Sequence, residues 1–95
     1  MLIGSCLLDI RLQGVKTLKN KRSIIKKLIN GIRKNFNVSI AEVGKQDITD
    51  RSEIGFSVVS TERSHVDSQI DNIINNMEYY GKYDIEIIYF EKEIY

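Results

Sequence analysis

Hydrophobic and polar residues alternate along residues 2–13, and this pattern predicts a strand with one buried face. The side expected to be buried carries Leu2, Gly4, Cys6, Leu8, Ile10 and Leu12, and Gly14 ends the strand. Thr17 can then cap a helix that runs to about Asn35. In this segment the apolar residues recur at intervals of three and four: Ile25, Leu28, Ile29, Ile32 and Phe36. The first third of the chain is therefore read as a strand followed by an amphipathic helix.

Residues 36–43 and 52–60 are rich in β-branched and aromatic side chains, and each run predicts a strand. The polar loop 44–50 joins them, so they should pair as an antiparallel hairpin. Thr61 or Ser60 caps a second helix that Gly81 ends. Its apolar stripe consists of Val66, Ile70, Ile73, Ile74 and Met77, and residues 83–94 supply a last alternating strand.

The resulting order, β-α-β-β-α-β, is that of the ferredoxin-like split fold in the α+β class. This fold is a sandwich in which a four-stranded antiparallel sheet carries two helices on one face. A chain of 95 residues can enclose one hydrophobic core, so residues 1–95 are expected to form a single domain. The fold hosts enzymes, metal carriers, RNA binders and regulatory modules, and function must be argued from the surface.

The sequence predicts a cytoplasmic protein without a membrane segment. No apolar run approaches the roughly 20 residues that a membrane-spanning helix needs. The first residues alternate like a strand and carry no basic region typical of a signal peptide. Cys6, the sole cysteine, falls on the buried side of the first strand and is expected to be inert.

No residue pattern predicts catalysis, a metal or a cofactor. The sole histidine, His65, lies in the first turn of the second helix, away from the apolar stripe, and is expected to be solvated. Asp47, Asp50 and Glu53 surround the loop without the spacing of a calcium site. The glycines are scattered and form no phosphate-binding loop, so we expect no enzyme.

Charge is distributed unevenly along the chain. No acidic residue occurs between Asp9 and Glu42, while the first helix is strongly basic. Steps of 100° place Lys19, Arg22, Lys26 and Arg33 in one stripe beside the apolar seam, and Lys27 and Lys34 broaden it. Such a row suits contact with nucleic-acid phosphates.

Two explanations that need no partner stay open for the same charges: internal pairing and a simply solvated helix face. The second helix carries Asp67, Asp71 and Glu78 on the corresponding side of its own apolar seam. Because a pseudo-twofold axis relates the two halves of this fold, these sides either face each other or both face outward. In the first case the charges would pair internally, and exposed pairs contribute only about 0 to 1 kcal/mol each.

The sheet face opposite the helices is the second candidate surface. Residues expected there include Ile3, Leu7, Val43, Val59, Ile88 and Phe90, among the small residues Ser39, Ala41, Gly55 and Ser57. A face this apolar favours a homodimer or a protein partner. Its two central strands show no aromatic residue on which an RNA base could stack.

Several segments together resemble the YlxP family of small bacterial proteins, a domain of unknown function. They are the run 18–23, the run 36–43, Gln46-Asp47 with Arg51 four residues on, 53–55, 58–60 and His65-Val66. Ile48-Thr49 departs from the family, which tends to carry an aromatic residue there. The resemblance implies a ferredoxin-like fold, dimerisation, a cytoplasmic location and no catalytic residue. It also implies an association with genes for transcription and translation-initiation factors.

Within the first of these motifs, Lys19, Lys21 and Arg22 are assigned to phosphate contact, which makes Lys19, Lys21, Arg22, Lys26, Arg33 and Lys34 the predicted nucleic-acid-binding set. Glu42, Gln46, Asp47 and Arg51 are expected to close the hairpin loop through a local salt bridge and hydrogen bonds. The leading hypothesis is a non-enzymatic, dimeric protein that binds RNA or a ribosomal subunit. The alternative is a dimeric protein-interaction or regulatory module that uses the open sheet face.

Overall fold

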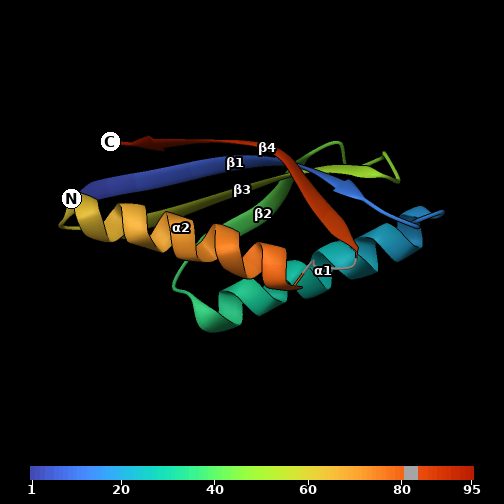
Figure 1. Ribbon diagram of the computed structural model, residues 1–95, viewed down its shortest axis with the longest axis horizontal. Coiled ribbons are helices and arrows are strands. Elements are labelled where there is room, and N and C mark those ends of the chain that lie inside the picture. The colour runs from blue at the N-terminus through green and yellow to red at the C-terminus, as the bar shows by residue number, and fades with distance from the viewer. Residues whose placement is uncertain (81–83) are drawn as a thin grey trace.

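The computed structural model describes residues 1–80 and 84–95, and its elements follow the predicted order (Figure 1). They are β1 (Leu2–Leu12), α1 (Leu18–Asn35), β2 (Ser39–Gly44), β3 (Arg51–Ser60), α2 (Arg63–Tyr80) and β4 (Ile85–Ile94). The helix end predicted at Gly81 and the strand start predicted at residue 83 lie outside the described residues.

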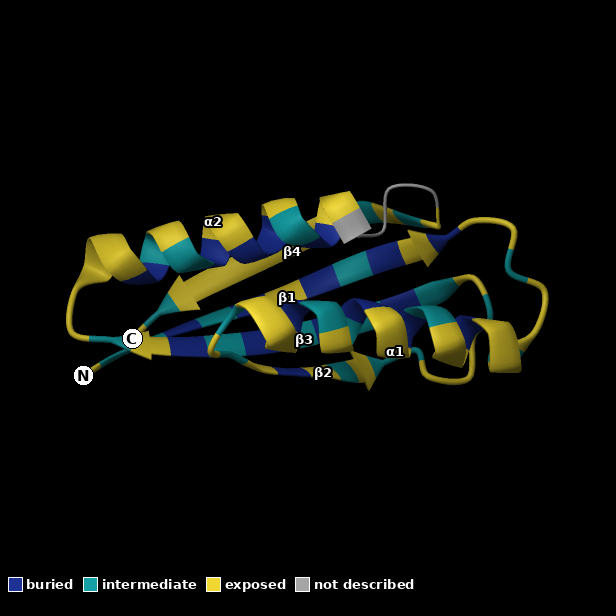
Figure 2. Ribbon diagram, turned by 90° about the horizontal axis from the view of Figure 1, so that it is seen from below, coloured by how far each residue is buried: buried dark blue, intermediate teal, exposed yellow. Residues whose placement is uncertain are grey.

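The strands form one four-stranded sheet in the order β2-β3-β1-β4, and all three neighbouring pairs are antiparallel. Both helices lie on the same face of this sheet (Figure 1). Seen from the helix side, α1 follows the β2 edge and α2 follows the β4 edge (Figure 2). The α+β ferredoxin-like split fold predicted from the element order is thus confirmed.

The core lies between the sheet and the helices. Leu8, Ile10 and Ile54 point from the two central strands toward Ile32 of α1 and Ile70 of α2, and all five are fully buried. Side chains of this size each contribute about 1.5 to 3 kcal/mol on full burial. The alternating pattern of the strands and the three- and four-residue spacing in the helices therefore predicted correctly which faces pack against each other.

The predicted cap at the start of α1 is confirmed, whereas the predicted start of the strand that follows α1 is corrected. The Thr17 hydroxyl accepts a hydrogen bond from the Asn20 backbone N–H at 3.1 Å and caps the helix, as predicted. At the other end, the Phe36 N–H donates to the Ile32 carbonyl and completes the last turn. The prediction that a strand begins at residue 36 is therefore wrong, because β2 begins at Ser39.

A bulge in β4 corrects the predicted position of Phe90. Asp9 pairs with Tyr89 and Ile10 with Ile87, which leaves Ile88 as an extra residue. One extra residue exchanges the two faces of everything beyond it. Phe90 accordingly pairs with Leu8 and lies on the helix side of the sheet, not on the open face.

Because Gly4 has no side chain, α2 can pack closely against β1 at this position, and a substitution there tests that packing. A Cβ at Gly4 would meet the Val66 side chain and would come within 2.9 Å of Ile70 Cδ1. Because both side chains belong to the buried seam of α2, Gly4→Ala should push the helix away and reduce the free energy of unfolding by about 1 to 3 kcal/mol. Urea denaturation measures this loss.

Gly55→Ala is the matched control, because Gly55 lies in β3 on the opposite face of the same sheet. The three atoms nearest to a Cβ there would all belong to the side chain of Val43, the closest at 3.3 Å, and Val43 is exposed enough to turn aside. Its effect should stay within about 0.5 kcal/mol. Equal losses in the two variants would contradict the close packing of α2 on Gly4.

Candidate nucleic-acid interface

The basic side of α1 faces outward along the β2 edge of the molecule. Ile25, Leu28 and Ile32 bury the opposite side of the helix in the core. The outer stripe, which we define as Lys19, Arg22, Lys26 and Arg33, is exposed along the whole helix. Burial of the apolar seam thus fixes where these cations point.

The acidic residues of α2 lie at the other edge of the molecule. Lys92 of β4 reaches Asp67 at 3.3 Å and Asp71 at 3.4 Å. Burial of the Lys92 ammonium works against its charge, but the two carboxylates outweigh this and raise its pKa. The equivalent sides of the two helices therefore both face outward.

No ion pair joins α1 to α2 in the described part of the chain. Internal pairing between the helices is therefore wrong for these residues, whereas the other explanation without a partner, a solvated helix face, is not contradicted. Lys19, Arg22 and Lys26 likewise contact no carboxylate among residues 1–80 and 84–95. Their charges face solvent.

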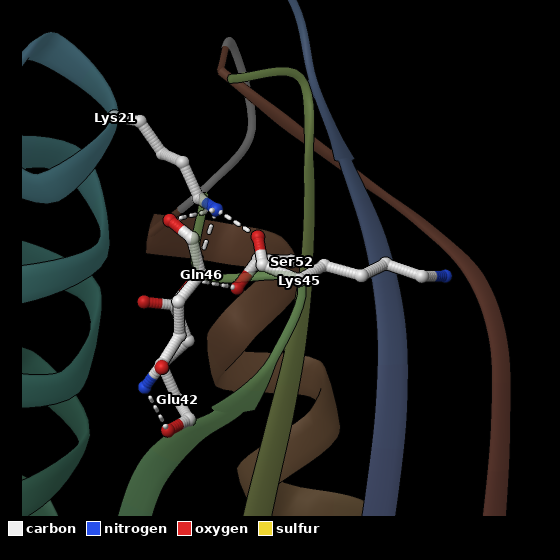
Figure 3. Close-up of polar contacts among 5 residues, drawn as sticks. All are labelled: Lys21, Glu42, Lys45, Gln46 and Ser52. Atoms are coloured by element: carbon white, nitrogen blue, oxygen red, sulfur yellow. Dashed lines mark hydrogen bonds and ion pairs between the residues drawn. The ribbon is translucent and has the colours of Figure 1, made fainter. Parts of the chain in front are cut away.

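Lys21 is a correction to the predicted phosphate-binding set, because its side chain is 0% exposed. Its ammonium lies 3.1 Å from a Glu42 carboxylate oxygen and donates to the backbone carbonyls of Lys45 at 2.6 Å and Gln46 at 3.3 Å (Figure 3). The buried Ser52 hydroxyl donates to the same Glu42 oxygen at 2.6 Å. Lys21 therefore holds the β2–β3 turn against α1 and is inaccessible to a phosphate.

Arg33 and Lys34 occupy the last turn of α1, where cations are favourable beside the free carbonyls of the helix end. The Arg33 guanidinium donates to the Ile40 backbone carbonyl of β2 at 2.9 Å. Arg33 thus has a structural role at the sheet edge in addition to its place in the outer stripe. Lys34 is exposed beside it.

A second ion-pair cluster lies on the open sheet face. One oxygen of Asp9 accepts from Arg51 at 2.7 Å and from Lys45 at 3.0 Å. Burial of the carboxyl opposes ionisation, but the hydrogen bonds and charges of Lys45 and Arg51 outweigh it and lower the pKa of Asp9. Lys45 links the two clusters, since its carbonyl faces Lys21 while its side chain points away toward the other face (Figure 3).

These contacts correct the prediction that a local salt bridge closes the hairpin loop. Arg51 pairs with Asp9 of β1 and Glu42 pairs with Lys21 of α1, so the main ion pairs are not local to the loop. The Gln46 side chain does make a local bond, donating to the Glu42 carbonyl at 3.5 Å. Sequence reasoning missed these pairs because Lys21 and Glu42 are far apart in the chain, as are Asp9 and Arg51, and each pair meets only after folding.

The one histidine and the one cysteine of the sequence lie in opposite environments, since His65 is exposed and Cys6 is buried. His65 is exposed, with Nδ1 2.9 Å from the Ser60 hydroxyl and Nε2 3.2 Å from the Gln69 amide. Burial raises the pKa of the Cys6 thiol to about 11, which suppresses the reactive thiolate. Neither α1 nor α2, the helices of the described residues, has the apolar length of a transmembrane span.

The fold and its surfaces define a small ferredoxin-like protein with a basic helix and an open sheet face. A family model described as protein of unknown function DUF503 matches residues 3–91, and the chain belongs to that family. The uncharacterized protein YlxP of Bacillus subtilis (strain 168) is 29% identical over 73 residues, which cover 77% of this chain and 79% of that protein. The family resemblance seen in the sequence motifs is thereby confirmed.

Solved structures support the fold alone. A de novo designed protein with a ferredoxin fold has a TM-score of 0.61 at 18% identity, covering 99% of this chain and 85% of the design. SnoaB, a cofactor-independent oxygenase from Streptomyces nogalater, has a TM-score of 0.62 at 4% identity, covering 100% and 92% of the two chains. A designed protein and an oxygenase sharing this architecture illustrate that the fold does not specify function.

Replacing Lys21 with methionine tests the buried cluster. The change leaves the Glu42 carboxylate and two carbonyls without their shared cation, and breaking a buried pair typically costs about 3 to 5 kcal/mol. Lys21→Met should therefore lower the free energy of unfolding by several kcal/mol in urea titrations. Lys27→Met, on the exposed side of the same helix, should change it by less than about 0.5 kcal/mol.

Adding Glu42→Gln to Lys21→Met should recover part of the lost stability, because the unpaired carboxylate is then removed. A Lys21→Met variant as stable as the natural chain would show that the cluster does not hold the turn in place.

Acid titration tests the Asp9 cluster. Because the folded protein lowers the pKa of Asp9, this carboxylate contributes stability above its unfolded pKa of about 3.9, and the contribution disappears as the pH falls through the lower folded value. Asp9→Asn should therefore lower the melting temperature at about pH 7, with a difference that shrinks toward about pH 2. A constant difference for Asp9→Asn would contradict the assigned ionisation.

Proposed function

We propose that this protein is a non-enzymatic, cytoplasmic RNA-binding protein that contacts RNA or a ribosomal subunit through the outer stripe. The observation that carries the proposal is the exposure of Lys19, Arg22 and Lys26 without a carboxylate partner in the described residues. The carboxylates that would have masked them, Asp67 and Asp71, are instead bound to Lys92 at the opposite edge.

The outer stripe suits a phosphate backbone in length and rigidity. Lys19 and Arg33 are 14 residues apart, which corresponds to about 21 Å along an α-helix. The cations therefore form a preset row and not a flexible basic tail. Binding through such a row releases counterions, so four phosphate contacts would give log K a slope of roughly −3 to −4 against log salt concentration.

The positions of the aromatic residues favour a base-paired or otherwise folded RNA. Proteins that bind single strands stack unpaired bases on aromatic side chains. Among the described residues, the exposed large aromatics lie at the end of α2 and along or just after β4, away from the outer stripe: Tyr79, Tyr89, Phe90 and Tyr95. The α1 surface can therefore recognise RNA through its shape and its phosphates, and not by stacking on its bases.

The open sheet face supports a second candidate function, that of a protein-interaction or regulatory module. Leu7, Val43 and Val59 remain exposed on this face. They would provide apolar contacts for a protein partner, independently of the outer stripe.

Charge reversal in the outer stripe tests the RNA proposal. Arg22→Glu combined with Lys26→Glu should weaken binding to bacterial 30S subunits at least tenfold, because two phosphate contacts become repulsive. Sedimentation over a salt series measures this, and the salt slope should fall by about 2. Arg33 is left unchanged because it also binds the β2 edge.

The matched control is Lys16→Glu combined with Arg63→Glu, which makes the same change in net charge at exposed positions outside the stripe. Its binding should remain within about twofold of the natural chain if contact is local to α1. Binding to 30S subunits that is unaffected by Arg22→Glu and Lys26→Glu, or insensitive to salt, would refute the proposal.

A further inference from the structure

β4 is an outer strand of the sheet, so one side of its backbone has no neighbouring strand in the described part of the chain. Its pairing with β1 identifies the groups on that side. Tyr95 and Ile3 exchange both of their backbone hydrogen bonds, at 2.8 and 2.9 Å. In an antiparallel pair every second residue faces the partner strand, so Glu93 and Glu91 face β1 as well. The residues between them, whose N–H and C=O groups point outward, form what we call the free edge: Phe90, Lys92 and Ile94.

The opposite edge of the sheet is less open to another strand. β2 has six residues against ten for β4, and the Arg33 guanidinium already binds the Ile40 carbonyl on β2. The bulge at Ile88 distorts the first half of β4, which confines regular pairing to the free edge. Unpaired N–H and C=O groups in a row are a template for an added strand. The free edge is therefore where this sheet can be extended.

A groove lies beside the free edge, on the helix side of the sheet, where α2 follows β4 (Figure 2). Its volume is about 390 Å³, and its apolar lining consists of Ile74 and Phe90. Polar side chains of α2 complete the lining: Asp71, Asn75 and Glu78. In an antiparallel pair, residues directly opposite each other carry their side chains on the same face of the sheet. A side chain opposite Phe90 on an added strand would therefore enter this groove.

The surroundings of the free edge are acidic on both faces of the sheet. On the helix side, Asp71 and Glu78 line the groove, and Lys92 offsets one negative charge there. On the open face, the exposed Glu91 and Glu93 lie between the residues of the free edge. A cationic strand would be attracted on both faces, whereas a second β4 would bring the same carboxylates into repulsion. Charge thus selects a basic partner and disfavours a second copy of this chain.

We propose that the free edge binds an extended, arginine- or lysine-rich segment of another protein, which joins the sheet as an antiparallel strand beside β4. Main-chain hydrogen bonds provide affinity in this mode, and the alternating side chains provide selectivity. An arginine opposite Phe90 fits the groove, because its methylene stem can cover Ile74 while its guanidinium lies over the Phe90 ring and near Glu78. The free edge is separate from the outer stripe, so this binding does not depend on RNA.

Amide hydrogen exchange tests the strand pairing. A synthetic peptide of about ten residues, in which arginine alternates with threonine, serves as the added strand. In the free protein the N–H groups of Glu91 and Glu93 are bound to β1 and should exchange slowly, whereas those of the free edge should exchange fast. The peptide should slow exchange at Phe90, Lys92 and Ile94 at least tenfold. Peptide binding that leaves these three amides unprotected would overturn the proposal, because attraction by charge alone gives no such protection.

Calorimetric titration with the same peptide tests the charge selectivity. Glu78→Lys combined with Glu91→Lys should weaken binding at least tenfold, because a carboxylate on each face of the edge becomes a cation. Asp47→Lys combined with Asp50→Lys makes the same change in net charge at exposed loop positions, and should stay within about twofold of the natural chain. Thermal melts establish that each variant is folded. Equal losses in the two variants, or no saturation by about 1 mM peptide, would contradict the proposal.

Two further measurements separate this site from other partners. Arg22→Glu combined with Lys26→Glu should leave peptide binding within about twofold, because the outer stripe lies at the opposite edge of the molecule. Loss of RNA binding and loss of peptide binding are then distinguishable. Exchange of the free-edge amides is also followed over a concentration series without peptide. Protection that grows with protein concentration would show that a second copy occupies the edge, and would refute a basic segment as its partner.

Discussion

The buried ammonium of Lys21 is the constraint on which the surfaces of this protein depend. A charged group without solvent contact is tolerated only when anionic and carbonyl oxygens surround it, and here Glu42 and the carbonyls of Lys45 and Gln46 do so. These contacts bind the start of α1 to the β2–β3 turn. They also fix the turn from which Lys45 reaches through to Asp9 on the other face. One cation thereby couples the helix layer to the open face.

The arrangement of charge follows from the same packing. The helices lie side by side on the sheet, α1 along the β2 edge and α2 along the β4 edge (Figure 2). Their apolar seams are buried in the core, so their charged sides lie at opposite edges of the molecule. Lys92 binds two of the acidic residues of α2, Asp67 and Asp71, whereas Lys19, Arg22 and Lys26 of the outer stripe have no carboxylate partner among the described residues. A chain with a net charge of only +1 thus presents one concentrated basic surface. Net charge alone would not have indicated it.

Sequence reasoning recovered part of the candidate site and misassigned part. Lys19, Arg22 and Lys26 lie where helical spacing placed them, because an exposed helix face is set by local geometry. The assignment of Lys21 to phosphate contact was wrong because a charged residue is normally exposed to solvent. Its burial is favourable only because Glu42, distant in the sequence, and the turn carbonyls bind its ammonium. The prediction that Phe90 lies on the open face was wrong for a different reason, because a single bulge at Ile88 exchanged the faces of the rest of β4.

The sequence by itself determined the element order and the fold class, because hydrophobic period, capping residues and turn residues act over a few neighbouring positions. The family followed from the resemblance of its motifs. Thr17 as the helix cap and the buried Leu8 and Ile10 are examples. The tertiary structure alone decided which charges pair, because partners such as Asp9 and Arg51 are far apart in the chain. It also decided which cations stay free and which apolar residues face solvent. Those two outcomes define the surfaces proposed for RNA and for a protein partner.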